Sequence, residues 1–362
     1  MKVVHVETGR RFYGGAQQVI YLLQGLTSCH IDCLLVCPPG SGIDVAARSS
    51  GIAVENLDCA GDLDLAFARR LRRLLMDMQP DLAHCHSRRG ADLLGGYAAA
   101  MAGVPALVSR RVDSAESRAM AALRYRPFRR VIAISENVAA ALTSSGLQQE
   151  RLEIIRSAVP VGPVTTPAAR EVLCRDFGIA DDEVAIAMVA QMIPRKGHRS
   201  LMDVIPNLRD TIPRVRVVLF GEGPLESKLR GLAQHLHLGD ALQFAGFRGD
   251  LDEFLGAFDI LVHPASQEGL GVAMLKAAAA GIPVVAFDVA GAREAVVHGQ
   301  TGLLVPPGDL RMLQRTLAVL AAEPDTRRAM GEAGRDRMLR EFAVETMVEQ
   351  HIELYEDVLA DL

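Results

Sequence analysis

The chain has 362 residues and a formal net charge of −5, with 49% apolar and 23% charged residues. This length is typical of two domains, and the composition excludes a largely disordered protein. Residues 1–165 hold 19 Lys/Arg and 15 Asp/Glu, a net charge of +4, whereas residues 166–362 hold 20 and 29, a net charge of −9. The asymmetry indicates different partners for the two halves, although +4 is too small to indicate nucleic-acid binding.

The first half opens with an apolar run at residues 2–7, which predicts a β-strand rather than a signal peptide. Further apolar runs then alternate with amphipathic segments, and this alternation predicts βαβ units and a parallel sheet covered by helices on both faces. Strands are expected at 2–7, 32–37, 52–57, 82–86, 105–109, 131–134 and 152–156. Helices are expected between them, including 15–27, 64–79 and 88–102.

Residues 160–167 contain three prolines and one glycine, which predicts a linker. We expect an N-terminal domain at 1–160, a second domain at 168–342, and a C-terminal helix at 343–362 that crosses back to the first domain. The predicted fold class is α/β, with two doubly wound Rossmann-like domains that face each other across a cleft and bind ligands at the carboxyl ends of their strands. In the second domain, strands are expected at 184–190, 215–220, 241–244, 259–262, 283–286 and 302–305.

Cysteine usage and hydropathy both favour a cytoplasmic protein. The six cysteines include no C-x-x-C pair, so we expect free thiols in a reducing compartment. No stretch approaches 18 uninterrupted apolar residues, so no transmembrane helix is expected.

A glycine pair follows the first strand, at the start of the expected helix. Gly14 and Gly15 would let backbone N–H groups approach a phosphate at the helix N-terminus, although a simple tight turn has the same sequence signature. A dinucleotide-binding domain requires G-x-G-x-x-G, and the spacing of Gly9, Gly14 and Gly15 does not fit it.

An acidic, glycine-rich loop follows the expected strand at 259–262. The strand leads into His263, and the loop contains Glu268-Gly269-Leu270-Gly271 immediately before an expected helix. A loop at a helix N-terminus favours anions. Glu268 fits better as an acceptor of hydrogen bonds from sugar hydroxyls, although it could also be a helix cap.

This region resembles the retaining GT-B glycosyltransferases of family 4. That family carries an acid, then glycines, a second Glu eight positions after the first, an Ala-rich stretch and Gly-x-Pro-Val. Residues 268–271 and 277–285 match the first and last parts. The position of the second Glu is Lys276, which has no acceptor for ribose hydroxyls, and a basic position of the family is Gln191. The resemblance covers nearly the whole chain.

The resemblance implies three catalytic residues. Glu268 would position the donor sugar, His86 would contact sugar or acceptor hydroxyls, and Lys196, with Arg195, would stabilise the departing nucleoside diphosphate. His86 also fits a core histidine, and Lys196 a solvated lysine. The implied donor-binding residues are Gly14, Gly15, Arg195, Lys196, Gly221, His263, Glu268, Gly269, Leu270, Gly271 and Lys276.

The implied reaction is a hexosyl transfer of the EC 2.4 class with retention of anomeric configuration. A UDP-sugar is the expected donor, as a substrate, and neither a cofactor nor a metal ion is expected. The N-terminal arginines, including those mixed with apolar residues at 115–130, would suit an anionic acceptor or membrane surface, although a solvated helix face has the same pattern. The expected setting is lipopolysaccharide or cell-surface polysaccharide assembly at the inner face of the cytoplasmic membrane.

Two other functions remain open at the level of sequence. A non-catalytic relative, acting as a nucleotide- or glycan-binding partner subunit, would be consistent with Lys276 and Gln191. A nucleotide-sugar epimerase on the same fold would need a dedicated acid and histidine for proton transfer, and no such set is evident. Glu268, Lys196 and the Gly14-Gly15 pair together favour the transferase.

Overall fold

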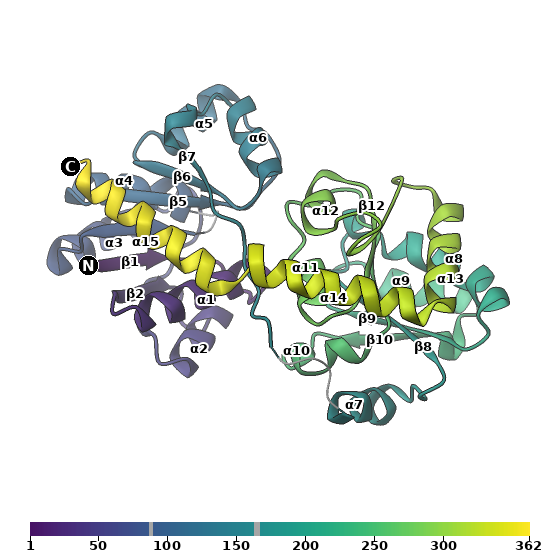
Figure 1. Ribbon diagram of the computed structural model, residues 1–362. Coiled ribbons are helices and arrows are strands. Elements are labelled where there is room, and N and C mark those ends of the chain that lie inside the picture. The colour runs from purple at the N-terminus through teal and green to yellow at the C-terminus, as the bar shows by residue number, and fades with distance from the viewer. Residues whose placement is uncertain (87–89, 163–166) are drawn as a thin grey trace. The chain divides into compact units, whose positions relative to one another are not determined.

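The computed structural model describes residues 1–86, 90–162 and 167–362, which form two compact units (Figure 1). Unit 1 comprises Met1–Ala158 and Val344–Leu362, and unit 2 comprises Val159–Ala343. The sequence placed these boundaries at 160 and 343. Residues 87–89 and part of the expected linker, 163–166, lie outside the described residues.

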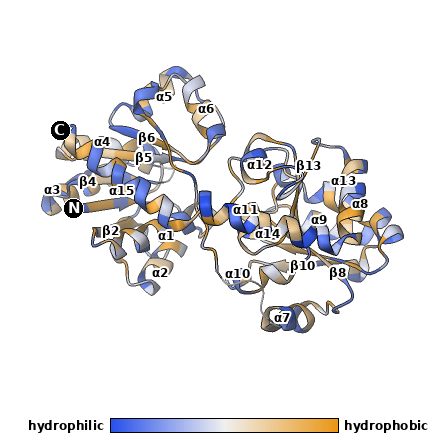
Figure 2. Cartoon of the chain, in the orientation of Figure 1, coloured by the Kyte–Doolittle hydropathy of each residue, from blue (hydrophilic) through white to orange (hydrophobic). Residues whose placement is uncertain are grey.

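Unit 1 contains a seven-stranded parallel sheet in the order β3-β2-β1-β4-β5-β6-β7. This order reverses direction between β1 and β4, as in doubly wound folds. All four residues of β4 are buried because helices cover both faces. Figure 2 shows hydrophobic and hydrophilic residues alternating along the helices of both units. The strands are β1 (Lys2–Val6), β2 (Asp32–Cys37), β3 (Ala53–Asn56), β4 (Leu82–Cys85), β5 (Ala106–Arg110), β6 (Arg130–Ala133) and β7 (Leu152–Ile154).

The C-terminal helix α15 (Val344–Ala360) belongs to unit 1 and completes one of its cores. Val348 and Tyr355 of α15 share a buried cluster with Leu22 and Leu26 of α1 (Gly14–Ser28). The described part of the helix expected at 88–102 begins with a π-helical turn at Ala91–Gly95. The remaining helices of unit 1 are α2 (Gly42–Ser49), α3 (Leu65–Met78), α4 (Gly96–Ala102), α5 (Arg118–Tyr125) and α6 (Glu136–Ser144).

Unit 2 contains a six-stranded parallel sheet in the order β10-β9-β8-β11-β12-β13. The neighbours β8 and β11 are important for function because their carboxyl ends lie side by side. The strands are β8 (Val184–Val189), β9 (Val215–Phe220), β10 (Leu242–Gly246), β11 (Ile260–His263), β12 (Val284–Phe287) and β13 (Gly302–Val305).

The helices of unit 2 bury apolar side chains against this sheet. Leu201, Ile205 and Leu208 recur at helical spacing along α8, and all three are buried in a core cluster that also contains residues of β8 and β9. The helices are α7 (Pro167–Phe177), α8 (His198–Thr211), α9 (Glu226–His235), α10 (Leu251–Phe254), α11 (Val272–Ala279), α12 (Ala290–Ala295), α13 (Leu310–Ala322) and α14 (Pro324–Glu341).

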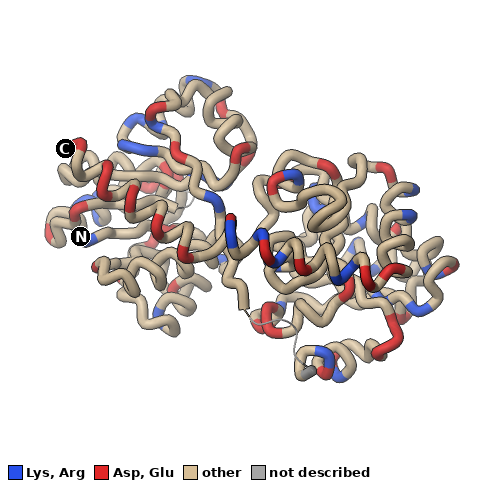
Figure 3. Tube along the Cα trace, in the orientation of Figure 1, with Lys and Arg blue, Asp and Glu red and all other residues tan. Residues whose placement is uncertain are grey.

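Charged residues of both signs occur in both units. Figure 3 shows acidic and basic residues interleaved over both units. Among the described residues, no helix is both long and apolar enough to cross a membrane. All six cysteines lie in the described part of the chain as free thiols, and Cys29 and Cys174 are the two exposed ones.

Candidate functional site

Three predicted residues meet at the adjoining carboxyl ends of β8 and β11 in unit 2. Lys196 lies in a 3-10 turn after β8, His263 ends β11, and Glu268 lies in the loop before α11. The Glu268 Oε2 atom is 2.8 Å from His263 Nε2 and also accepts a hydrogen bond from Lys196 Nζ. The side chains of Glu268 and Lys196 are only 9% and 12% exposed. The cluster is therefore a largely buried ionic site rather than a solvated surface pair.

The electrostatics of the cluster keep Glu268 ionised. Burial alone raises the pKa of Glu268, but the hydrogen bond from His263 and the charge of Lys196 outweigh it and lower that pKa to about 2. Burial lowers the pKa of His263 more than Glu268 raises it, so the imidazole is neutral at pH 7. His263 then donates its Nε2–H to the carboxylate. Glu268 is consequently a hydrogen-bond acceptor and not a proton donor.

Two glycines bring the neighbouring loops close enough to form this site. Gly197 has φ +77°, and a Cβ on it would lie 1.8 Å from the Pro264 carbonyl oxygen. A Cβ on Gly291 would lie 2.3 Å from the Glu268 carbonyl oxygen. Gly197 follows the predicted Arg195-Lys196 pair, whereas nothing local in the sequence singled out Gly291.

Unit 1 contains a cavity of about 220 Å³ that includes two predicted residues, Gly15 and His86. The carbonyl oxygen of Gly15, at the start of α1, accepts a hydrogen bond from Arg111 Nη1. Sequence reasoning placed Arg111 among surface arginines and did not identify Glu7. The lining residues are Glu7, Arg11, Tyr13, Gly15, Ala16, His86, Asp92, Val108, Ser109, Arg110, Arg111, Val112 and Tyr125.

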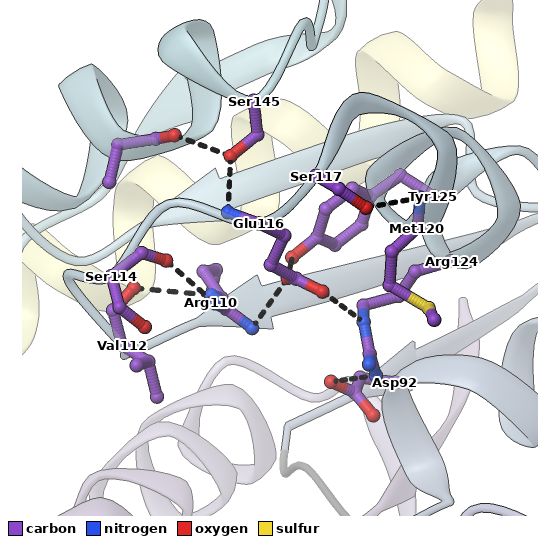
Figure 4. Close-up of polar contacts among 11 residues, drawn as sticks. Asp92, Arg110, Val112, Ser114, Glu116, Ser117, Met120, Arg124, Tyr125 and Ser145 are labelled. Carbon is purple, nitrogen blue, oxygen red and sulfur yellow. Dashed lines mark hydrogen bonds and ion pairs between the residues drawn. The ribbon is translucent and has the colours of Figure 1, made fainter.

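A buried ionic network lies beside this cavity and contributes Asp92, Arg110 and Tyr125 to its lining. Figure 4 shows the polar contacts of the network. Glu116 lies 3.1 Å from Arg110 Nη1 and 3.1 Å from Arg124 Nε, and Arg124 Nη1 lies 2.8 Å from Asp92. The Tyr125 hydroxyl donates to Glu116 over 3.1 Å. Two guanidinium groups thus face two carboxylates, and the network is neutral overall.

This network corrects part of the prediction that the N-terminal arginines form a basic surface. Arg110 and Arg124 are 3% and 6% exposed, and Tyr125 and Phe128 belong to the core. The reason is that the charges of the two arginines are compensated by acids that lie far away in sequence or in the preceding loop. Residues that do remain exposed on this segment include Arg118, Met120, Leu123, Arg126 and Arg129.

A cluster of buried histidines lies behind the cavity because β1 and β4 are neighbours. His5 pairs with His84 in the strand register, and His5 Nδ1 is 2.9 Å from His86 Nε2. The two nitrogens of His84 bond to the Tyr355 hydroxyl at 2.6 Å and the Ser109 hydroxyl at 2.8 Å. Burial lowers the pKa of each of the three imidazoles, so all are neutral at pH 7.

The three histidines place ring nitrogens within 4.8 Å of one another, as a metal site would require. Two features disfavour a cation there. Both nitrogens of His84 are already hydrogen-bonded. In addition, a positive charge lies close by. Burial and the neighbouring histidines lower the pKa of both His84 and His86, and the guanidinium of Arg111 lowers it further.

Both units match glycosyltransferase family models. Residues 13–162 match the model of Glycosyltransferase Family 4, and residues 170–337 match that of Glycosyl transferases group 1. The chain carries the paired domains of a GT-B glycosyltransferase. The family 4 match contains Gly14, Gly15 and His86, and the group 1 match contains Lys196 and Glu268.

Individual proteins resemble one or both of these glycosyltransferase domains. A GDP-mannose-dependent monoacylated alpha-(1-6)-phosphatidylinositol monomannoside mannosyltransferase of Corynebacterium glutamicum is 34% identical over 51% of this chain and 50% of its own length. Several other curated relatives are likewise matched over about half their length. The lipopolysaccharide core biosynthesis glycosyltransferase LpsE of Rhizobium meliloti is 24% identical over 98% of both chains.

The fold of this GT-B chain is also found in solved structures. The structure of HepE from Anabaena, in complex with UDP and glucose, has a TM-score of 0.89 and 20% sequence identity. It covers 99% of this chain and 100% of that chain. At this identity the likeness establishes the fold.

Within the group 1 domain, the structure places the remaining predicted residues around the Glu268 loop or on separate elements. Arg195 Nη1 donates to the Gln267 carbonyl at 3.2 Å and so braces the loop. Lys276 lies on α11 and forms an ion pair with Asp252 of α10. Its Nζ atom is 2.7 and 3.0 Å from the two carboxylate oxygens of Asp252. Gly221 follows β9 with φ +114°.

Proposed function

We propose that this chain transfers a hexose from a nucleotide-sugar donor, a UDP-sugar, to a glycan or lipid-linked glycan with retention of anomeric configuration. The observation that carries the proposal is the Lys196–Glu268–His263 cluster within the group 1 domain. Support for the donor comes from HepE, whose structure holds UDP and glucose. The name of LpsE supports a role in lipopolysaccharide or cell-surface polysaccharide assembly.

Each residue of the cluster has a distinct part in this reaction. Glu268, ionised and held on one oxygen by Lys196 and His263, would use its remaining lone pairs to accept hydrogen bonds from donor-sugar hydroxyls. Lys196 retains two further N–H donors for the diphosphate, whose negative charge grows as the glycosidic bond to phosphate breaks. Within unit 1, the amides at Gly14 and Gly15 and the imidazole of His86 would bind phosphate or hydroxyl oxygens of a substrate.

Retention requires no enzymic nucleophile if the acceptor attacks from the side on which the diphosphate leaves. The acceptor hydroxyl oxygen then bonds to the anomeric carbon, the bond to phosphate breaks, and the hydroxyl proton passes to a phosphate oxygen. Glu268 does not have to carry that proton, which agrees with its lowered pKa.

Binding of the nucleotide gives the first test. In calorimetry and thermal-shift measurements with UDP, GDP, ADP, CMP and their sugar conjugates, we expect specific binding of UDP and UDP-sugars. Lys196→Ala should weaken UDP binding by about a hundredfold or more, corresponding to roughly 3 kcal/mol, because one charge-assisted contact to the diphosphate is lost. Lys228→Ala, at an exposed position of α9, serves as the matched control and should bind normally.

The same panel decides between the transferase and the non-catalytic alternative. Folded protein that binds no nucleotide in the panel would contradict the proposal and favour a partner subunit. Binding of GDP or another diphosphate with equal dependence on Lys196 would preserve the transferase and replace the proposed donor.

A second prediction concerns Lys276, which we propose contacts the donor in place of the family's glutamate. Lys276→Met should weaken UDP-sugar binding about tenfold, because a cationic donor of hydrogen bonds is lost. The free energy of unfolding should change by less than about 1 kcal/mol, because the pair with Asp252 is partly exposed. Calorimetry and urea denaturation measure the two effects, and Lys276→Glu checks the alternative: binding that holds or improves with glutamate would show that Lys276 is only a tolerated variant.

A further inference from the structure

His5 is a fully buried residue whose side chain contacts His86 directly. Its Nδ1 is 2.9 Å from His86 Nε2, and the two ring planes are nearly parallel, with centroids 5.2 Å apart and an interplanar angle of 6°. His5 is 0% exposed, and its Nε2 has no hydrogen-bond partner among the described residues. His86 lines the cavity of unit 1, and Nε2 is the nitrogen of its ring that faces His5.

These contacts determine which nitrogen of each neutral ring carries the proton. If His5 carried its proton on Nε2, a buried N–H donor would be left unsatisfied, which is rare and costly in proteins. A proton on Nδ1 lowers this cost, because Nδ1–H donates to His86 and a buried acceptor without a partner is tolerated more often than a buried N–H without one. Since the hydrogen bond at one ring nitrogen decides the state of the other, His86 must then accept at Nε2 and carry its proton on Nδ1.

We propose that His5 is a positioning residue that holds His86 in the Nδ1–H tautomer, so that His86 offers a hydrogen-bond donor, and not a base, to a substrate oxygen in the cavity. The guanidinium of Arg111, which also lines the cavity, likewise presents only N–H donors. Its Nε is buried without a partner among the described residues. A site of this kind suits a phosphate, carboxylate or hydroxyl oxygen. The role in substrate binding rests on the proposed function, whereas the tautomer does not.

The neighbouring histidines do not compete for this hydrogen bond. His84 is engaged by hydroxyl groups of Tyr355 and Ser109, which can rotate to donate or accept. His351 bonds through Nδ1 to the Met347 carbonyl, one turn earlier in α15. The ring of His86 also lies against that of His84, with centroids 3.9 Å apart, but its hydrogen bond within this cluster is the one with His5.

Nitrogen-15 NMR of the full chain labelled at histidine distinguishes the two tautomers without any substrate. We expect the His86 signal, assigned by its loss in His86→Gln, to show a protonated Nδ1 and an unprotonated Nε2. In His5→Asn, the side-chain amide can donate from the position of Nδ1, so the pattern should persist. In His5→Leu the donor is absent, and a form protonated on Nε2 should appear.

Three results would overturn the proposal: a wild-type His86 protonated on Nε2, an unchanged His86 pattern in a folded His5→Leu variant, or stoichiometric zinc binding that perturbs the His5 and His86 signals. Circular dichroism and thermal unfolding establish that each variant is folded. If transfer activity is found, His5→Leu should lower kcat/KM about tenfold and His5→Asn less than about threefold. Absence of activity would count against the proposed function while leaving the tautomer measurement intact.

Discussion

Replacing Glu268 by Gln is expected to lower kcat for sugar transfer by about 10²–10³-fold, the usual cost of removing one group that stabilises a transition state in a buried site. The amide keeps the size of the side chain but loses the negative charge that Lys196 and His263 bind. Donor-sugar hydroxyls would then meet a weaker acceptor, and Lys196 would lose its partner. Steady-state kinetics with the donor identified by the binding panel measure the effect.

Glu222→Gln is the matched control, because Glu222 is an exposed acid of the same unit. Its activity should stay within about twofold of the wild type, in line with the small effects of most surface substitutions. Activity of Glu268→Gln within about threefold of the wild type, in a folded protein that binds the donor, would contradict the role proposed for Glu268.

The same variant tests the electrostatics of the cluster through the pH dependence of stability. The pKa of Glu268 in the folded protein is lowered to about 2, so its contribution to stability is fully present above its ordinary value of 4.5 and is lost as the pH falls toward 2. The shift corresponds to about 3 kcal/mol. The free energies of unfolding of wild type and Glu268→Gln should therefore differ most near pH 7 and converge in acid.

Replacing Arg124 by Met is expected to destabilise unit 1 by about 3–5 kcal/mol, the usual effect of removing one partner from a buried ion pair. Arg124 binds both Asp92 and Glu116, and the side chains of these three residues are between 4% and 11% exposed. Without it, Asp92 loses its ion pair with Arg124, and Glu116 retains only Arg110 and the Tyr125 hydroxyl. Denaturant unfolding at pH 7 measures the loss.

Arg126→Met provides the control on the same segment, because Arg126 is exposed at the end of α5. It should change the free energy of unfolding by less than about 0.5 kcal/mol. A loss in Arg124→Met as small as that expected for Arg126→Met would show that Arg124 acts as an ordinary surface residue. Since Arg110 also bonds to the carbonyls of Val112 and Ser114, a disturbed network should additionally weaken ligand binding in the cavity of unit 1.

The sequence by itself determined the α/β class and most of the elements, and it selected Lys196 and Glu268 as candidate donor-binding residues. Alternating apolar and amphipathic segments are local signals, so the strands β1, β2 and β9 lie within a residue of the expected ranges. Lys196 and Glu268 could be selected because each belongs to a short motif whose residue types suit phosphate and sugar chemistry. Their mutual hydrogen bond was not predictable from those motifs, because it depends on β8 and β11 being neighbours in the sheet.

Only the tertiary structure decided which charged and titratable side chains are paired and buried. Arg124 had the sequence pattern of a surface cation, and it is buried because Asp92 and Glu116 compensate its charge. His5 was one residue of an apolar strand, and the register of β1 against β4 brings it to His84 and His86. The physical reason is that periodicity along the chain specifies each element, whereas partners across a sheet depend on strand order and register, which no local pattern encodes.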